Sequence, residues 1–395
     1  MPKNENQSGK KSRRGYWLCV IIVAAVTVFL NVLSILCTPF SDWYLKYIYP
    51  VFLNTIGRFT NLFPFSVGEW LAFLVINALV ILALWWIPAV ILKICKKGER
   101  FRRFTCSLYR FVLLSGCCIL LFLTLTEDII CHTSPIDPNP GREKREYTFE
   151  ELITVYNFVC EQIDKYAELQ TRDEDGWIIQ DKKVAMERSA KALQGLADRY
   201  PALAGWYPRL KPLFFSGIVT RMGTGGVFYP FSMEVNYNAL MYEGNYDTLA
   251  HELSHSHGFM REDEANFLAF AACTESDDPF LAYCGYLSVF YYLDRDVWEN
   301  YYSYSPEELD AMWLPEIYYP YNDYFDQDWC FLKPAKREQL DASDEFLTDI
   351  VSPETIDKIS DDVMDITLKM SGQSGMAAYG EVVGLLLQYY DGILY

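Results

Sequence analysis

Histidine is scarce in this chain of 395 residues, which contains only four, and basic residues are scarce in its C-terminal part. Residues 1–127 carry 14 Lys and Arg against 5 Asp and Glu, a net charge of +9, whereas the other 268 residues carry 20 against 47, a net charge of −27. A part with this acidic balance shows no stripe of basic residues of the kind that binds nucleic acid. The eleven cysteines include no Cys-x-x-Cys pair, so a thiolate zinc site has no support. The charge division indicates two parts that meet different solvents.

Long apolar runs account for the first part. Residues 17–37 and 70–92 are uncharged for more than 20 residues each, which is long enough for a helix to cross a hydrocarbon core of about 30 Å. A third run, residues 111–126, has only 16 residues, so a span over 108–126 requires Arg110 to extend its charged end to the interface. We expect three transmembrane helices at about these positions.

The distribution of basic residues predicts the orientation. The N-terminal segment has five Lys or Arg and the loop after the second run has seven, whereas residues 38–69 contain only Lys46 and Arg58. Because short cytoplasmic loops are rich in Lys and Arg, the N-terminus is expected in the cytoplasm and residue 128 onward outside it. A cleaved signal peptide would share the basic start, but the first run is too long and no small-x-small exit follows. The sequence therefore predicts a multi-pass protein of the cell membrane, with residues 1–127 as its anchor.

The outer part begins with a proline-rich linker over residues 128–147, followed by a domain over 148–395. Thr148 and Glu151 form a Thr-x-x-Glu capping box before an apolar periodicity typical of a helix. Glycines and β-branched residues then predict short strands at 227–229 and 232–237. The other expected helices cover residues 178–200, 246–259, 262–275, 279–293, 306–313, 353–370 and 376–390. The fold class is α+β and mainly helical, with a small sheet in one outer domain.

The stretch LAHELSHSHGFMREDEANF, Leu249–Phe267, holds three of the four histidines. His251 and His255 are four positions apart, so on an α-helix they lie about 40° apart around the axis and can share one metal ion. Glu252 lies about 100° from His251, where it can act on a metal-bound water without binding the metal. This His-Glu-x-x-His pattern predicts two zinc ligands and a general base, with Gly258 as the cap that ends the helix.

The third ligand has two candidates. In one known arrangement a third histidine follows six residues after the second, but Arg261 stands at that position and a guanidinium cannot bind zinc. The segment EDEAN resembles the Glu-x-Glu-Ala-Asp segment of gluzincin-type zinc peptidases, and the resemblance implies Glu264, the glutamate before alanine, as the third ligand. A tight turn after Gly258 would bring Glu264 within reach of the histidines. Glu262 is the alternative by the same argument of reach.

His257 is expected to play no part in metal binding. On a continuous helix it lies about 240° around the axis from His251 and about 200° from His255, so it faces away from both. A histidine near a helix C-terminus is favoured there as a cation. A role beside the metal, after the helix unwinds, is the alternative.

Four stretches together give the chain a resemblance to a known family. They are PFSVGEW before the second apolar run, HELSHSHGFMREDEANFLAFAAC, YCGYLSVFYYL and the C-terminal LKMSGQSGMAAYGEVVGLLLQYY. The chain resembles the membrane-anchored, zinc-peptidase-like proteins of domain of unknown function family 3810 over most of its length. The resemblance implies a zincin-like metallopeptidase domain after the membrane helices.

The expected function is that of a membrane-anchored zinc metallopeptidase acting on a peptide or protein substrate. Zinc would lower the pKa of a bound water, and Glu252 would pass its proton to the leaving amine. The strand before the metal helix would align an extended peptide as an edge strand, unless it is an ordinary internal strand. The oxyanion donor stays open among Tyr283, Tyr286 and Arg261. The alternatives are a zinc-dependent amidohydrolase acting on a cell-envelope component and a non-enzymatic envelope protein with a structural zinc site.

Overall fold

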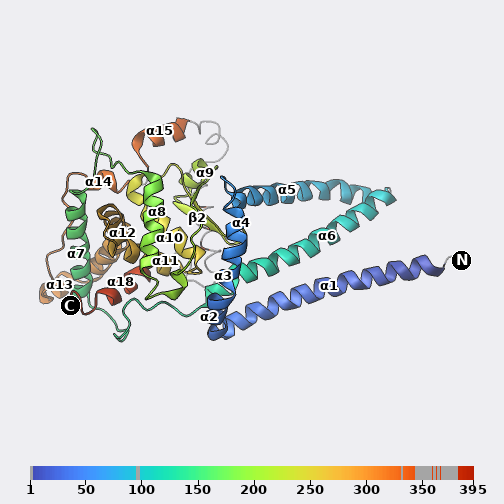
Figure 1. The fold of residues 1–395 in the computed structure, drawn as a ribbon, viewed down its shortest axis with the longest axis horizontal. Helices are drawn as coiled ribbons and strands as arrows, with labels where there is room; N and C mark the ends of the chain where they lie inside the picture. The colour runs from blue at the N-terminus through green and yellow to red at the C-terminus, as the bar shows by residue number, and fades with distance from the viewer. Residues whose placement is uncertain are drawn as a thin grey trace. The chain divides into compact units, whose positions relative to one another are not determined.

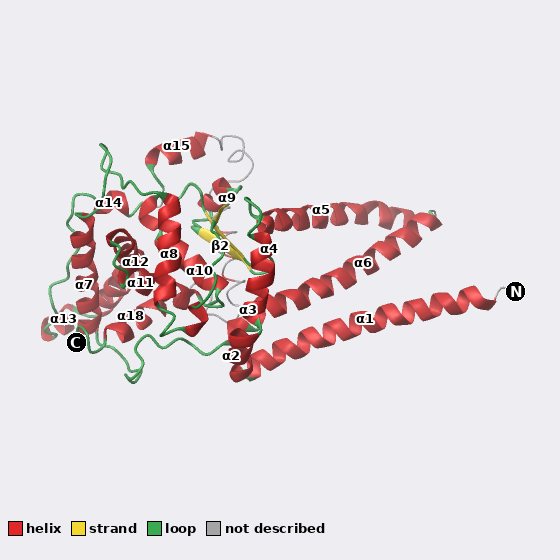
Figure 2. Cartoon of the chain, viewed as in Figure 1, coloured by secondary structure: helices red, strands yellow, loops and turns green. Residues whose placement is uncertain are grey.

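The computed structural model describes residues 3–94, 98–330, 332–342, 358, 362, 365 and 381–395. It is mainly helical with one small sheet, as expected from the sequence (Figure 2). The chain divides into two compact units, the first made of Met1–Phe52, Val67–Ser134 and Pro230–Ser232, and the second of Leu53–Ser66, Pro135–Tyr229 and Met233–Tyr395. This division differs from the expected anchor over residues 1–127, because the segment Leu53–Ser66 packs with the second unit.

Three long helices form the first unit: α1 (Lys3–Leu36), α5 (Val67–Ile94) and α6 (Glu99–Leu123) (Figure 1). By length and composition, three stretches are able to cross a membrane: Arg14–Leu36, Val67–Ile91 and Arg100–His132. The three expected apolar helices are therefore present. The third is longer than its apolar run, because α6 begins well before that run and continues through a π-helical turn, η2 (Thr124–Asp128), and a 3-10 turn, η3 (Ile130–His132).

Polar groups join α1 to the end of α6 within the first unit. Asn31 Nδ2 donates to Thr124 Oγ1 at 2.8 Å, and the Thr124 hydroxyl donates to Asp128 Oδ2 at 2.8 Å. Such pairing is required where apolar surroundings offer no water. Two short helices, α2 (Thr38–Tyr47) and α3 (Tyr49–Phe52), follow α1. Both lie within residues 38–69, where no helix was predicted from the sequence.

The first helix of the second unit starts where the sequence predicts. In α7 (Phe149–Ala167), Thr148 Oγ1 accepts from the Glu151 N–H at 3.2 Å and the Glu151 carboxylate accepts from the Thr148 N–H at 2.7 Å. The expected helix over 353–370 lies outside the described residues apart from three single positions. The smaller helices are η1 (Leu53–Gly57), α4 (Arg58–Thr60), α8 (Lys182–Gly195), η4 (Pro201–Leu203), α9 (Ser216–Arg221), η5 (Glu243–Asn245), α13 (Pro306–Ala311), α14 (Phe325–Asp328), α15 (Pro334–Ala342) and α18 (Val382–Tyr390).

Helix packing in the second unit places the histidine-bearing segment in the core. The helix α12 (Pro279–Ser303) packs against α7 and α11 (Glu262–Thr274), and α11 packs against α10 (Asp247–Ser256). Aromatic side chains such as Phe290 are fully buried between them, and each such burial stabilises the fold by about 1.5–3 kcal/mol. This core packing therefore holds α10 and α11, the helices that carry the histidines and the glutamates, in place.

The sheet has three short strands, β1 (Lys211–Pro212), β2 (Gly226–Tyr229) and β3 (Glu234–Tyr237), in the order β1-β3-β2. The central strand β3 pairs with β1 in parallel and with β2 in antiparallel fashion. Helix α10 packs against β2 and β3. Within the described residues, β2 is therefore an edge strand that lies against the helix carrying the histidines.

A buried ion pair explains why the segment Leu53–Ser66 belongs to the second unit. Lys211 is only 1% exposed, and its ammonium group pairs with the buried carboxylate of Glu234 on β3. The same ammonium donates to the carbonyl oxygens of Thr60 at 2.7 Å and Phe65 at 3.1 Å. All three donors of the lysine are thereby used. The segment between the first two apolar helices is thus fixed to the sheet.

Candidate metal centre

Helix α10 presents two imidazoles on one face. His251 and His255 lie one turn apart, and their rings meet edge to face with centroids 4.6 Å apart. The helix ends at Gly258, whose φ of +94° is readily adopted only by glycine. The Gly258 N–H donates to the His255 carbonyl at 2.9 Å, and the Phe259 N–H donates to the Ser254 carbonyl at 3.3 Å. This Schellman cap turns the chain sharply into α11, as the glycine predicts.

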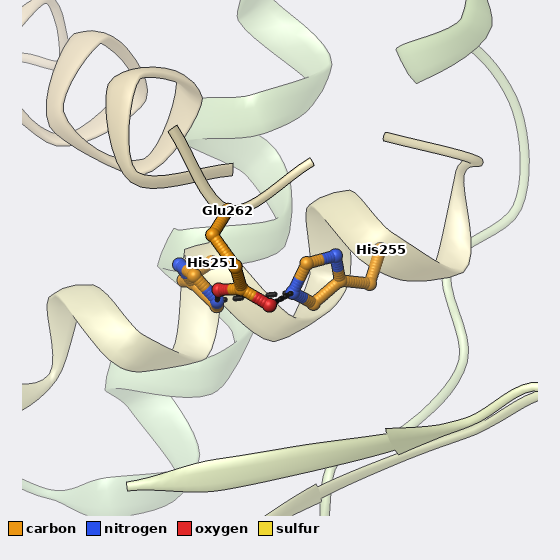
Figure 3. A group of neighbouring side chains, drawn as sticks. All are labelled: His251, His255 and Glu262. Carbon is orange, nitrogen blue, oxygen red and sulfur yellow. Dashed lines mark hydrogen bonds and ion pairs between the residues drawn. The ribbon is translucent and has the colours of Figure 1, made fainter. Parts of the chain in front are cut away.

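The start of α11 brings a carboxylate to the two imidazoles (Figure 3). Glu262 Oε2 lies 3.2 Å from His251 Nε2, and Glu262 Oε1 lies 3.7 Å from His255 Nε2. The two Nε2 atoms are 3.0 Å apart. One ligand atom from each of the three residues lies within 4.8 Å of the others. This is a compact group of three potential metal ligands at the junction of α10 and α11.

The structure brings Glu262 to the histidines, and the expectation that Glu264 lies there is wrong. Glu264 Oε1 instead accepts from the Ile136 N–H at 3.0 Å and lies 3.6 Å from Arg261 Nε. Both glutamates are on the first turn of α11, and residues two apart on a helix point about 200° apart. Once Glu262 faces the imidazoles, Glu264 must face the other side. Its buried carboxylate fixes the chain that leads into the second unit.

The backbone selects the tautomer of His255. Its Nδ1 atom is 2.7 Å from the Phe259 carbonyl oxygen, which can only accept, so Nδ1 carries the proton. In the neutral ring Nε2 then has a free lone pair, and that lone pair points at His251. Burial is the main reason that the pKa of His255 falls to about 4. In metal-binding histidines, the ring nitrogen that does not bind the metal commonly donates a hydrogen bond of this kind, which fixes the orientation of the ring.

Charge is concentrated around His251. Burial lowers the pKa of this imidazole, but the Glu262 carboxylate outweighs burial and the pKa rises to about 9. The carboxylate of Glu262 therefore stabilises positive charge at His251. A divalent cation between two imidazoles and a carboxylate satisfies the same electrostatic demand.

Glu252 lies against strand β2. Burial raises the pKa of its carboxyl to about 8, although the Phe228 N–H favours the charged form. Its Oε2 atom is buried and has no hydrogen-bond partner among the described residues. A buried acceptor of this kind needs a water or a ligand. The side chain fits beneath β2 because position 226 is glycine: a Cβ there would lie 2.4 Å from Glu252 Cγ.

His257 stands apart from the group, as expected from its position. It is the C-cap residue of α10, is only 3% exposed, and stacks on Tyr207 with ring centroids 3.9 Å apart. Its Nδ1 atom is 3.2 Å from the Leu253 carbonyl oxygen. Burial lowers its pKa to about 4, so it is a neutral core residue and not the cation expected at a helix end.

None of the three expected oxyanion donors belongs to the group. The Tyr283 hydroxyl donates to Asp328 at 2.8 Å, Tyr286 stacks on Tyr166 in the core, and Arg261 donates to Asp263 at 3.3 Å. These side chains therefore have partners outside the group.

Three residues near the group escaped the sequence analysis: Asp247, Asn266 and Tyr292. Burial and the carboxylates of Asp247 and Glu262 raise the pKa of Tyr292 to about 12. Burial likewise raises the pKa of Asp247 to about 7. Helical spacing is the signal that could have found two of them, because Asp247 is four residues before His251 and Asn266 is four residues after Glu262.

Comparison with known proteins gives a family without a described activity. The family described as "Protein of unknown function (DUF3810)" matches residues 44–387. The chain therefore belongs to this family, as its sequence resemblance implied. No curated protein and no solved structure matches the chain. Its chemistry has to be argued from the site itself.

Proposed function

We propose that this member of the DUF3810 family is a membrane-anchored zinc metallopeptidase of the zincin-like class. His251, His255 and Glu262 would hold the metal, and Glu252 would be the general base. The observation that supports this most is the convergence of two Nε2 atoms and a carboxylate at the junction of α10 and α11. Lone pairs that meet at such distances repel each other unless a proton or a metal cation lies between them.

The donor set fits zinc. Zinc binds histidine nitrogen and carboxylate oxygen at about 2.0–2.2 Å with tetrahedral geometry, so its ligand atoms stand about 3.4 Å apart. The three separations here, 3.0, 3.2 and 3.7 Å, lie on both sides of that value. Three protein ligands leave a fourth position open, which is typical of catalytic sites. The group is thus suited to a catalytic zinc without rearrangement of the backbone.

In the proposed reaction, the metal and Glu252 would have separate roles. A bound zinc ion would supply a Lewis acid for the scissile carbonyl and lower the pKa of water at the site. Glu252 would take the proton of the attacking water and donate it to the leaving amine. Its raised pKa suits that exchange near neutral pH, and its unpaired Oε2 is free to accept the proton.

Strand β2 would position the substrate. It lies over Glu252 and is paired with β3 on one side only, within the described residues. An extended peptide can add to such an edge through backbone hydrogen bonds, which aligns its amide groups with the strand. This arrangement favours a peptide over a smaller amide of the cell envelope, because the latter would leave the edge unused.

Metal analysis of matched variants tests the proposal. We expect about one zinc per chain in the purified parent and in Glu252→Gln, as an open three-ligand site requires, and hydrolysis of a peptide library only in the parent. Glu262→Gln should lose zinc, because it removes one of three ligands. Glu264→Gln is its matched control: the same change two residues away should keep zinc.

Two results would contradict the proposal in different ways. A parent that binds no zinc after dialysis against zinc at neutral pH removes the metal site. A parent that binds zinc but cleaves no peptide, with Glu252→Gln indistinguishable from it, leaves a structural site of the kind given as an alternative above.

The orientation in the membrane is also proposed. The basic N-terminal segment and the basic loop between α5 and α6 favour a cytoplasmic location for both. With three helices able to cross, the second unit would lie outside the cytoplasm, at the cell membrane. A lipid bilayer is then a permanent partner and envelope peptides or proteins are the accessible substrates.

A further inference from the structure

A cavity of about 160 Å³ lies in the second unit among η5, α10, α11, α12 and α14. Its wall combines charged, aromatic and apolar side chains with the amides and hydroxyls of Asn245, Thr248, Asn266 and Ser288. Asp247 provides a carboxylate, Tyr292 and Trp329 provide aromatic rings, and Leu287 provides an apolar surface. A chamber of this size is comparable to an engineered cavity of about 150 Å³ that binds benzene, so it has room for about six heavy atoms.

Helical spacing connects the cavity to the metal centre. Asp247 precedes His251 by one turn of α10, and Asn266 follows Glu262 by one turn of α11. Residues four apart share a helix face, so the two walls of the cavity continue the two faces that carry the proposed ligands. On both helices, a residue of the cavity wall therefore lies one turn from a proposed metal ligand.

The cavity contains one carboxylate without a lysine or arginine partner among the described residues. Asp247 receives N–H groups from its own backbone and from Thr248, and the cation that acts on it is the imidazole of His251, one turn further along α10. The other acid in the wall, Asp328, is different. Arg172 binds it at 2.6 Å, and the hydroxyls of Tyr242 and Tyr283 donate to it at 2.8 Å each. Asp328 is thus paired with an arginine, whereas the Asp247 carboxyl is available to pair with a cation in the cavity.

We infer that this cavity binds a short organic cation, an alkylammonium or guanidinium group. An apolar stem would contact Leu287, the aromatic rings would face the cation, and the Asp247 carboxylate would neutralise it. A neutral apolar occupant would strip water from Asp247 without replacing it, which is unfavourable. An anion would be repelled by the same carboxylate. The cation could be free or the side chain of a substrate residue, and the second source rests on the proposed function.

Calorimetric titration of the full chain in detergent tests this inference. The probes are n-butylammonium, which has five heavy atoms, and 1-butanol, its neutral isostere. We expect butylammonium to bind at least about tenfold more tightly than butanol, since an ion pair with a desolvated carboxylate exceeds a neutral hydrogen bond by at least that factor. Asp247→Asn should reduce the affinity for butylammonium about tenfold or more.

A steric variant and a charge-matched control complete the design. Ser288 lines the cavity, so Ser288→Leu should block binding while Asp247 stays intact, and this variant decides the matter if Asp247→Asn does not fold. Asp277 is exposed and outside the cavity wall, so Asp277→Asn removes the same charge and should bind as the parent does. Equal binding of butanol, no binding of butylammonium, or binding that both cavity variants retain would overturn the inference.

Peptide probes identify the source of the cation. N-acetyl-lysine amide should compete with butylammonium in the parent, whereas N-acetyl-norleucine amide should not. Failure of the lysine derivative alone would overturn the substrate-side-chain source and assign the cavity to a free amine. All of these are binding measurements, so they stand when hydrolysis is absent. Zinc content, measured in the same samples, reports separately on the proposed function.

Discussion

The position most sensitive to a single added carbon is Gly226, where β2 crosses Glu252. An ideal Cβ at this position would lie 2.4 Å from Glu252 Cγ and 2.8 Å from both Glu252 Cδ and the Asn236 carbonyl oxygen. Ordinary carbon contacts are about 3.5–4.0 Å, so in Gly226→Ala the strand or the glutamate must move by about 1 Å. The backbone itself tolerates alanine, because Gly226 is not among the glycines with positive φ. The expected effect of Gly226→Ala therefore comes from the steric contacts of the added methyl group alone.

The size of the effect follows from that displacement. Overpacking of this kind costs about 1–3 kcal/mol, and 1 kcal/mol corresponds to about 2–4 °C in melting temperature for a domain of 150–250 residues. We therefore expect Gly226→Ala to lower the melting temperature by at least about 2 °C. If Glu252 is the general base, a 1 Å shift should also reduce kcat about 10²-fold. Zinc content should not change, because none of the three proposed ligands is among the nearest groups that a Cβ at Gly226 would meet.

Thermal melts followed by circular dichroism, zinc analysis and peptide cleavage measure these quantities on the full chain. Gly384→Ala is the matched control, since a Cβ at Gly384 in α18 meets nothing within 4 Å and alanine favours a helix. It should melt at or above the temperature of the parent. Should Gly226→Ala melt like the parent and cleave within twofold of it, the argument that β2 confines Glu252 fails.

Two further predictions concern the second unit and its place in the cell. Lys211→Met leaves Glu234 buried without its cation and should lower the free energy of unfolding by about 3–5 kcal/mol in urea titrations; adding Glu234→Gln should recover part of that loss, and equal stability of the single and double variants would refute the reasoning. A periplasmic-type reporter fused after Tyr395 should be active and a cytoplasmic one inactive, because the basic loops favour the cytoplasm; the reverse pattern would contradict the orientation.

Short-range rules gave the parts of the fold that depend on neighbours in the chain. The apolar runs are helices able to cross a membrane, the capping box at Thr148 starts α7, and Gly258 ends α10. The spacing of His251 and His255 placed both imidazoles on one face. Each of these outcomes is set within about one or two helical turns, which is the range over which residue types act directly on the backbone.

The choice between Glu262 and Glu264 could not be settled in this way. The resemblance to gluzincin-type segments pointed to Glu264, but α11 begins one residue after Arg261 and its phase turns Glu262 to the histidines. A shift of two residues rotates a side chain by about 200°, so the ligand depends on where the turn ends and on how α11 packs. That packing is fixed by α12 and by the partner of Glu264 on residue 136.

The sequence by itself determined that this chain has three apolar helices, an acidic second part, and a histidine pair with helical spacing, because those properties are local. Only the tertiary structure decided that the segment Leu53–Ser66 joins the second unit through Lys211. It alone placed Glu262 at the imidazoles and put Asp247, without a lysine or arginine partner among the described residues, in the wall of a cavity. The physical reason is the same in each case. The partners of a charged side chain in the core are the groups that tertiary packing brings next to it, and these groups come from other elements of the chain.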